Sequence, residues 1–475
     1  MRFVRAALTV NCLAAAFAAA DWDPASAVEV ESQTWQTGNN PKGCVTGYSR
    51  DIVADLVGER VYLHMVYASC PSAVGGGPSY YIKYRRGYYD VASGPDSFTW
   101  DTGYTSGGQI ISGSLTGRFK MSPTLAVTAG HRLYAFWADS SHCEETNGLW
   151  NNVEIYGSAA AFSPSAPPSW TWFNEPQRVS DGAWTSDMPV CVTDDAEPPF
   201  AHIFWRDGRD AAIGGDLTNI YTEAWDENAV HYPAGGQLLS TNGGLTYYGM
   251  YDVLDTRVDA FCDGEGYIHL VWADARAGTT APAIYYKRRA PDGTWSADVC
   301  LKTVAGGVAT DWECAPMICP ITLPNGENPG GDICVMAHLR YGMANAPGAP
   351  PIMYVYNSGN STWYYISVNN CAFGVVWRGA LTSEVTNNVV HVLYPSTATG
   401  SPGNLLYRRG HVTTSAVTWD AAKTVYTTNS DTRFPSLTLD RNHVLHAFFH
   451  NHAAGTPEVA TMYYLNDDGD NFVGP

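Results

Sequence analysis

The fold of this chain is decided by a short apolar stretch that reads YIHLVWAD at residues 267–274. Within it, His269 and Trp272 are three residues apart in a run of β-branched and aromatic residues, which is typical of a buried β-strand. The same His-x-x-aromatic pattern recurs along the sequence at intervals of 53 to 70 residues. The copies are His64…Tyr67, Tyr134…Trp137 (with Tyr in place of His), His202…Trp205, His269…Trp272, His338…Tyr341, His391…Tyr394 and His446…Phe449. This near-regular repeat predicts seven copies of one structural unit.

Each unit contains three further strand-like segments in a fixed order. A segment often introduced by Pro comes before the His-x-x-aromatic strand, a Tyr-rich segment follows it, and a Trp-marked segment usually closes the unit. The Pro residues are Pro123, Pro189, Pro316 and Pro435, and the closing Trp residues are Trp100, Trp172, Trp295, Trp363 and Trp419. Seven units of about four short antiparallel strands predict an all-β chain folded as a seven-bladed β-propeller. A solenoid is the rival architecture, but four-stranded units suit it poorly.

The two ends of the chain are expected to close the ring together. The last unit stops soon after Tyr464, and the segment Glu29 to Gly38 contains Trp35 in a setting like that of the other closing strands. The alternative is that residues 468–472 give the last blade its own fourth strand. We expect a single propeller domain over residues 28–475.

The composition narrows the class of protein. The chain has 475 residues and a net charge of −19, with 27 Lys and Arg against 46 Asp and Glu. Hydrophobic residues make up 45% of it, which is enough for a large core. The acidic balance argues against nucleic acid and anionic membranes as general partners.

The N-terminal segment resembles a signal peptide. Arg2 and Arg5 precede an apolar run from Ala6 to Ala20, and small-x-small sites would allow cleavage after residue 20 or residue 27. We therefore expect residues 1–27 to be a leader and the protein to be secreted, extracellular or periplasmic, without a membrane span. Ten cysteines follow the leader, so disulfides are expected, but one sequence does not give their pairing.

Several segments resemble the repeat of sialidase-like, Asp-box-type propellers. The resemblance rests on Trp272-Ala273-Asp274-Ala275-Arg276, the following Ile284-Tyr285-Tyr286, and the turn Pro291-Asp292-Gly293-Thr294-Trp295. That turn is a shortened form of the family's S-x-D-x-G-x-x-W box, and the family's Phe-Arg-Ile-Pro motif is absent. The resemblance implies a seven-bladed propeller that handles glycans. Propeller polysaccharide lyases are similar at the level of the fold only.

In such a propeller, the loops after the second strands and the connections between blades meet around the mouth of the central channel, which is the expected binding site. Five charged residues directly precede the innermost strand in different blades: Asp51, Asp187, Arg257, Arg378 and Arg433. Three converging arginines suit a carboxylate or sulfate, because a guanidinium is planar, permanently charged and bidentate. The alternative is that each arginine bridges neighbouring blades. Trp312 and Trp377 are candidates for stacking on sugar rings, or for packing between blades.

Catalysis would need further groups at the same mouth. Sialidase-type chemistry uses a Tyr activated by a carboxylate, and Tyr251, Asp252 and Asp187 are the candidates. The pairs Asp207/Arg209 and Asp274/Arg276 could form an acid and an anion clamp, but their recurrence favours a repeated salt bridge that holds a loop. The repeat histidines belong to separate blades, so they cannot share one metal and are expected to pack between sheets.

No cofactor is indicated, with one candidate exception. Asp467, Asp468, Asp470 and Asn471 offer the oxygen ligands that calcium prefers, although a full calcium-binding loop is absent and a solvated acidic turn is the alternative. Three hypotheses remain open: a sialidase-like glycoside hydrolase (a lyase being less favoured), a non-catalytic module that binds glycans or proteins, and a structural propeller. The expected partner is a glycan or another extracellular ligand, and the sequence does not give an oligomeric state.

Overall fold

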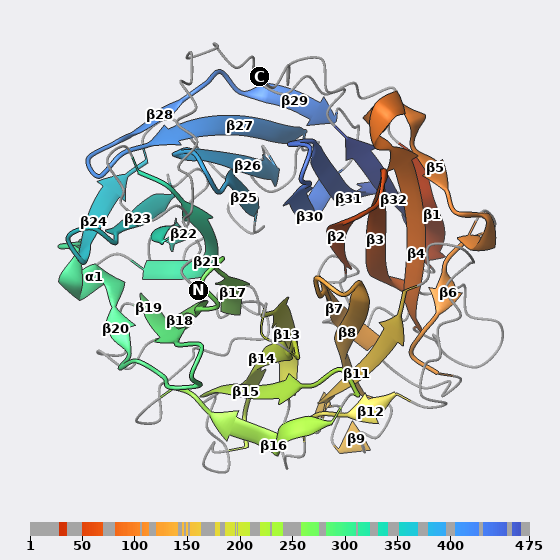
Figure 1. Cartoon of the computed structure of the whole chain (residues 1–475), viewed down its shortest axis with the longest axis horizontal. Coiled ribbons are helices and arrows are strands. Elements are labelled where there is room, and N and C mark those ends of the chain that lie inside the picture. Colours follow the sequence, from red (N-terminus) through yellow and green to blue (C-terminus); the bar gives the residue numbers. More distant parts are fainter. Residues whose placement is uncertain are drawn as a thin grey trace, which may run out of the picture.

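A computed structural model of the chain consists almost entirely of β-strands arranged in a ring (Figure 1). Seven antiparallel sheets surround a centre, and the innermost strand of each sheet faces it. The structure describes residues 28–35, 50–69, 81–104, 107–113, 120–140, 145–146, 149–150, 153–162, 176–180, 186–194, 196, 198–209, 219–228, 230–240, 258–274, 282–309, 312–323, 331–340, 351–368, 379–395, 404–426, 431–453 and 458–466. The ring of seven sheets confirms the predicted seven-bladed β-propeller.

The first three blades follow one another along the chain, each built from the centre outward. Blade one contains β2 (Arg50–Val57), β3 (Arg60–Ser69), β4 (Tyr81–Asp90) and β5 (Thr99–Trp100), with β6 (Gln109–Ile110) also on β4 and three 3-10 turns, η3 (Val91–Ser93), η4 (Pro95–Ser97) and η5 (Thr102–Tyr104). Blade two contains β7 (Lys120–Val127), β8 (Arg132–Asp139), β11 (Glu154–Ala161) and β12 (Gln177–Arg178), and β9 (Glu145–Thr146) pairs with β10 (Leu149–Trp150) in a separate hairpin. Blade three contains β13 (Ser186–Thr193), β14 (Ala201–Asp207), β15 (Asn219–Trp225) and β16 (His231–Leu238).

The remaining four blades repeat this plan. Blade four contains β17 (Val258–Cys262), β18 (Ile268–Asp274), β19 (Ala283–Arg289) and β20 (Val299–Cys300), followed by helix α1 (Leu301–Val304). Blade five contains β21 (Trp312–Ile321), β22 (Asp332–Arg340), β23 (Ile352–Asn357) and β24 (Thr362–Ser367). Blade six contains β25 (Ala380–Glu384), β26 (Val389–Pro395), β27 (Leu405–Val412) and β28 (Val417–Trp419), with β29 (Lys423–Tyr426) also on β27. Blade seven contains β30 (Asp431–Leu439), β31 (Leu445–Ala453), β32 (Glu458–Asn466) and, outermost, β1 (Val28–Trp35).

The ring is closed by strands from the two ends of the chain. Strand β1 pairs antiparallel with β32, from Val28 opposite Tyr464 to Trp35 opposite Glu458. The expected closure is confirmed, and it covers the edge of β32, which would otherwise offer unpaired backbone groups. Residues 467–475, which include the alternative closing segment, lie outside the described residues.

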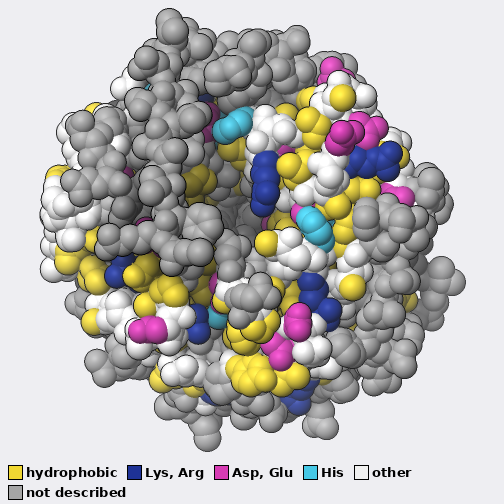
Figure 2. Space-filling view, in the orientation of Figure 1, with side chains coloured by type: hydrophobic (Ala, Val, Ile, Leu, Met, Phe, Trp, Pro, Cys, Tyr) yellow, Lys and Arg dark blue, Asp and Glu magenta, His cyan; other side chains and the backbone are white. Residues whose placement is uncertain are grey.

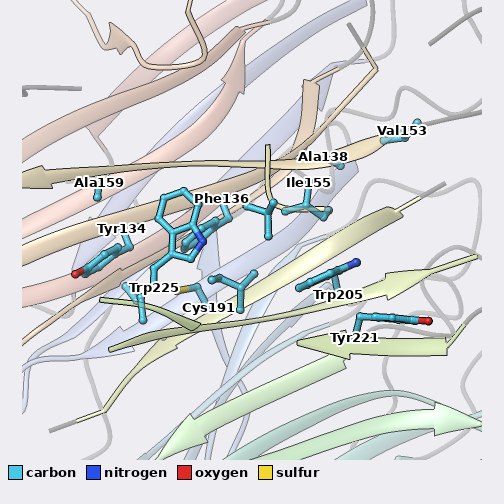
Figure 3. Packing of buried hydrophobic residues seen from close by; sticks show 14 residues of the cluster. Tyr134, Phe136, Ala138, Val153, Ile155, Ala159, Cys191, Trp205, Tyr221 and Trp225 are labelled. Carbon is cyan, nitrogen blue, oxygen red and sulfur yellow. The ribbon is translucent and has the colours of Figure 1, made fainter. Parts of the chain in front are cut away.

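The core lies between neighbouring blades, because side chains alternate between the two faces of each strand. In β14, Ile203 and Trp205 face blade two, whereas Phe204 faces blade four. Figure 3 shows the layer between blades two and three, where Trp225 and Phe136 meet edge to face with centroids 4.8 Å apart. Trp137, Trp205 and Trp272, the repeat aromatic residues of blades two, three and four, are fully buried.

The repeat histidine is the centre of a buried hydrogen-bonded triad. In blade four, the Nε2 atom of His269 lies 3.0 Å from an oxygen of Asp263, and its Nδ1 atom lies 2.9 Å from the hydroxyl of Tyr286. Equivalent carboxylate–His–Tyr groups lie in blades one, six and seven. Asp440–His446–Tyr464 keeps both hydrogen bonds, at 3.0 and 2.9 Å. Asp55–His64–Tyr84 and Glu384–His391–Tyr407 keep the hydrogen bond to Tyr, while the carboxylate lies 4.0 and 3.3 Å from Nε2 without forming a hydrogen bond to it. Blade three keeps the Asp194–His202 contact at 2.8 Å and has Thr222 in place of Tyr. The expectation that these histidines pack between sheets is confirmed.

Blade five departs from the sequence prediction. The strand registers place Cys334, not His338, at the repeat position. Cys334 lies opposite Cys319 on β21 and Val355 on β23. His269 of blade four lies opposite the equivalent residues, Phe261 and Arg288. The sequence alignment was wrong by four residues, because a His that happens to lie further along β22 imitates the pattern. The correction changes the two neighbouring repeat intervals from 69 and 53 residues to 65 and 57.

Blade two replaces the triad by apolar packing. Tyr134 stands at the His position, and Gly157 stands where the triad Tyr would be. A Cβ atom at Gly157 would lie 2.4 Å from the Phe136 ring and 2.8 Å from Trp225, so only glycine fits beneath this aromatic pair. The hydroxyl of Tyr134 donates a 3.0 Å hydrogen bond to the backbone oxygen of Asp226 in the next blade.

The marker prolines lie inside the innermost strands, not before them as the sequence suggested. Strands β7, β13, β21 and β30 each carry a bulge at the Pro, between Met121 and Thr124, Asp187 and Val190, Cys314 and Met317, and Arg433 and Ser436. A β-bulge can hold a Pro because one residue there makes no ladder hydrogen bond. In three of the bulges the residue before Pro has positive φ, which is 51° for Ser122, 53° for Met188 and 46° for Ala315. The helices among the described residues are short, and none has the length and hydropathy of a membrane span.

Candidate functional site

The structure locates some of the predicted site residues but not all. Asp187 is described together with its contacts. Trp312 and Arg433 are placed as backbone in β21 and β30, and their side chains are outside the description. The residues that lie outside the described ranges are Tyr251, Asp252, Arg257, Trp377, Arg378 and Arg276, together with the candidate calcium group Asp467, Asp468, Asp470 and Asn471.

Two of the predicted residues share one level of the ring. In the strand register, Asp187 lies opposite Arg206, and Arg433 lies opposite His450. Both partners lie four residues beyond the repeat histidine of their own blade, which is His202 in blade three and His446 in blade seven. The two residues therefore occupy the same register position, directly before the Pro bulge and at the end of the blade opposite to the triads.

Asp187 is held by an ion pair with Arg206. The guanidinium donates from Nε over 2.7 Å to one carboxylate oxygen and from Nη2 over 2.5 Å to the other. The Arg206 side chain is 1% exposed and that of Asp187 12%. Because both of its oxygens accept from a buried guanidinium, Asp187 is better placed to fix Arg206 than to exchange a proton with a substrate.

Asp207, next along the chain, anchors the end of β14. Its carboxylate accepts hydrogen bonds from the Ser186 hydroxyl at 2.9 Å, the Trp205 indole at 2.8 Å, and the backbone N–H and Nη2 of Arg209 at 2.8 and 2.7 Å. The Arg209 guanidinium also lies over the Tyr221 ring, 4.3 Å from its centroid. The Asp207/Arg209 pair thus holds the beginning of a loop, as the recurrence of the motif suggested.

Blade two adds buried charged groups beside this cluster. The Asp139 carboxylate accepts from Lys120 and, over 3.3 Å, from the indole of Trp137. Glu154 accepts from Arg178 and from the hydroxyl of Ser180. Burial raises the pKa of Glu154, and the nearby charge of Asp207 adds to the rise. Sequence reasoning missed Lys120, Glu154 and Arg206, because no motif distinguishes them from other charged residues at strand ends.

A close Tyr–carboxylate pair between blades four and five was also missed by sequence reasoning. The Tyr354 hydroxyl donates a 2.6 Å hydrogen bond to Glu313, whose other oxygen accepts the backbone N–H of Ile284 at 3.0 Å. Both side chains are fully buried between blades four and five. Burial, together with the charge of Glu313, raises the pKa of Tyr354, whereas a Tyr nucleophile needs an easily lost proton. This pair has a structural role.

The inner strands are joined around the channel by polar side chains. The Asp51 carboxylate in β2 accepts the Leu125 N–H at 3.0 Å and the Thr124 hydroxyl at 3.1 Å, both from β7. Asp259 in β17 accepts the Ile318 N–H of β21 at 3.0 Å in the same way. Burial raises the pKa of Asp51 to about 6, with a further small contribution from the charge of Asp259. The Asp51 carboxylate therefore links blade one to blade two and does not point into the mouth as a ligand.

The charges on the surface are mixed. On the face drawn in Figure 2, the described basic side chains are scattered around the ring and do not gather into one patch. Within the described ranges, no group of three or more His, Cys, Asp and Glu side chains is arranged to hold a metal ion.

The turn with the shortened Asp-box connects β19 to β20, which is a third-to-fourth strand connection. The Asp292 carboxylate accepts the backbone N–H and the hydroxyl of Thr294 at 2.9 and 2.7 Å. Gly293 has φ 90°, and Trp295 forms a bridge back to Arg289. The motif thus acts as a folded turn.

Comparisons with known proteins give matches of structure alone. No family model matches the chain, and no curated protein matches it. Among solved structures, the intramolecular trans-sialidase from Ruminococcus gnavus is 10% identical, with 94% of this chain and 99% of that chain covered and a TM-score of 0.44.

Two other solved structures are similar to a comparable degree. The GH93 α-L-arabinofuranosidase of Fusarium graminearum is 13% identical, with coverage of 72% and 91% and a TM-score of 0.44. A protein of unknown function from Dyadobacter fermentans is 12% identical, with coverage of 93% and 99% and a TM-score of 0.43. Similarities this distant carry no argument about activity. On its own geometry the chain is a seven-bladed β-propeller with four-stranded blades, which is the fold that the sialidase-like resemblance implied.

Proposed function

We propose that this protein is an exported propeller that binds an acidic glycan at the rim where the inner strands begin. The observation that carries the proposal is the shared register position of Arg433 and Asp187, directly before the Pro bulges of blades seven and three. The bulges mark one level of the ring, and Asp187 and Arg433 of two different blades lie at it. An arginine at this level suits the carboxylate of a sialic or uronic acid, because the guanidinium can donate two parallel hydrogen bonds to it.

Arg257 and Arg378 are proposed as further ligands of the same acid, since Arg257 directly precedes β17 and Arg378 lies two residues before β25. Trp312 and Trp377 are proposed to stack on sugar rings. The proposal also includes export, with residues 1–27 as the leader.

Binding is the better-supported activity, and hydrolysis is the second candidate. Asp187 is engaged by Arg206 through both oxygens, and the Glu313–Tyr354 pair is buried, so neither supplies a ready acid or nucleophile at the mouth. Hydrolysis would instead need a Tyr activated by a carboxylate, as the resemblance to sialidase-like propellers implies, and Tyr251 and Asp252 are the candidates proposed for it.

The test is titration of the chain with sialylated, uronate-containing and sulfated oligosaccharides and with neutral oligosaccharides of the same length, with mass spectrometry of each mixture. We expect an acidic glycan to bind and Arg433→Gln to weaken it about 10- to 100-fold, the loss typical of one charged hydrogen-bond pair. Arg60→Gln is the matched control, because Arg60 is an exposed arginine paired with Asp90 at the opposite end of a blade. New products that vanish in Tyr251→Phe would establish hydrolysis. Equal affinity of the wild type and Arg433→Gln would reject the proposed site.

A further inference from the structure

Two cysteines face each other directly inside blade five. Cys319 in β21 and Cys334 in β22 are register partners in an antiparallel pair. Partners in such a pair have Cα atoms about 4.5 or 5.5 Å apart, and a disulfide requires Cα atoms about 4.4–6.8 Å apart. The backbone therefore already has the spacing of a disulfide, without any displacement of the strands.

The side chains also point toward the same place. Both cysteines belong to the apolar layer between blades five and six, with exposures of 3% and 0%. As register partners on neighbouring strands, the two side chains project to the same face of the sheet. Cys314 and Cys319 are the two cysteines closest in sequence, five residues apart on the same strand. Five strand residues span about 16 Å, which is too far for a disulfide between them.

We propose that Cys319 and Cys334 form a cross-strand disulfide when the chain folds in an oxidising compartment. The oxidant is a small-molecule or protein disulfide. One thiolate attacks a sulfur of that disulfide and releases one of its thiols, and the second cysteine then displaces the other. Two protein thiols lose two electrons and two protons, and the oxidant becomes two thiols.

The bond forms before blade five packs against blade six. The interaction with the Cys319 thiol, together with burial, raises the pKa of Cys334, so the folded protein holds the unreactive thiol form. During folding both cysteines are exposed to the oxidant. The bridge closes a loop of the chain from 319 to 334, which constrains the unfolded state and stabilises the folded one.

The test is to refold the protein with oxidised glutathione, unfold it, label remaining thiols with iodoacetamide, and digest it without reduction. Trypsin with a glutamate-specific protease cuts after Lys302, Glu313, Glu327 and Arg340, so Cys319 and Cys334 lie on different peptides, 314–327 and 328–340. We expect these two peptides to appear linked, with Cys314 carrying the label, and to separate after reduction.

Two matched variants complete the design. Cys314→Ser should keep the linked peptides, and Cys319→Ser should leave Cys334 labelled. Dithiothreitol should lower the Tm of the wild type and of Cys191→Ser, which removes a buried cysteine of blade three, but not that of Cys319→Ser. Labelling of both Cys319 and Cys334 in the refolded wild type, or a bridge between Cys314 and either of them, would overturn the inference. Because the peptide map uses the wild type, the test stands even if a variant fails to fold.

Discussion

The carboxylate–His–Tyr triad of blade four gives a prediction whose size follows from the structure. Asp263 accepts the backbone N–H groups of Glu265 at 3.0 Å and Tyr267 at 2.8 Å with one oxygen, and His269 at 3.0 Å with the other. Burial opposes the ionisation of Asp263, but the hydrogen bonds from His269 and the turn outweigh it and hold its pKa below the usual value. One side chain thus closes the turn and fixes the imidazole.

Asp263→Ala removes all three hydrogen bonds. The two turn N–H groups are within reach of water, so each loss should cost about 0.5–1 kcal/mol. His269 is 2% exposed, and leaving its Nε2 atom unpaired should cost about 1–3 kcal/mol more. The expected loss in the free energy of unfolding is therefore about 2–5 kcal/mol. Asp263→Asn should lose less, because its amide oxygen can still accept from the turn while its NH₂ group donates to an imidazole with the reversed tautomer.

The measurement is guanidinium unfolding of each variant, followed by tryptophan fluorescence, together with hydrogen exchange of blade four. Thr128→Ala is the matched control. It alters the same position in blade two, where Tyr134 stands in place of the triad His, and removes only the 3.1 Å bond from the Arg132 N–H. If Asp263→Ala costs no more than Thr128→Ala, then the triads do not hold the blades, and the repeated histidine needs another explanation.

Two further predictions concern the mouth and the channel. Asp187→Ala should cost about 3–5 kcal/mol in the free energy of unfolding because it removes the carboxylate that accepts two hydrogen bonds from the buried Arg206 guanidinium, and adding Arg206→Met should recover much of the loss. Chemical denaturation of both variants would refute the pairing if the double variant were the less stable. The pKa of Asp51 is about 6 in the folded protein, above the 3.8 of the unfolded chain. Its ionised carboxylate therefore lowers the free energy of unfolding above pH 6, and this loss disappears as the pH falls toward 4. The Tm of the wild type should therefore rise relative to that of Asp51→Asn as the pH falls from 7 to 4, and a constant difference would show that Asp51 is not buried as described.

The Pro bulges of the innermost strands matter most for the function proposed here. In four blades the innermost strand carries a bulge at the same register position. Regular antiparallel pairing continues along the strand after each bulge. Bulges turn side chains aside from the regular alternation and are frequent beside functional sites. A rim built in this way can differ from blade to blade while the packing between blades stays the same, because the triads and the aromatic layers lie deeper in the blades.

The sequence by itself determined the number of blades, their strand order and the closure of the ring. These follow from local patterns: His-x-x-aromatic repeats, Tyr- and Trp-rich strands, and the isolated Trp35 strand before the first complete unit. A strand buried between two blades must be apolar on both faces, so the second strand of each blade is visible in the sequence alone, although its register is not. The same reasoning placed the histidines between sheets, since equivalent positions in separate blades cannot meet.

The tertiary structure decided what depends on register and on contacts between distant segments. His338 imitates the repeat in sequence, but pairing with β21 and β23 puts Cys334 in its place. The partner of Asp187 is Arg206, and that of Glu313 is Tyr354, which are separated by 19 and 41 residues. Such pairs leave no local pattern, because a carboxylate at a strand end reads the same whether it faces solvent, an arginine or a tyrosine. Only the alignment of strands within and between blades brings the partners together.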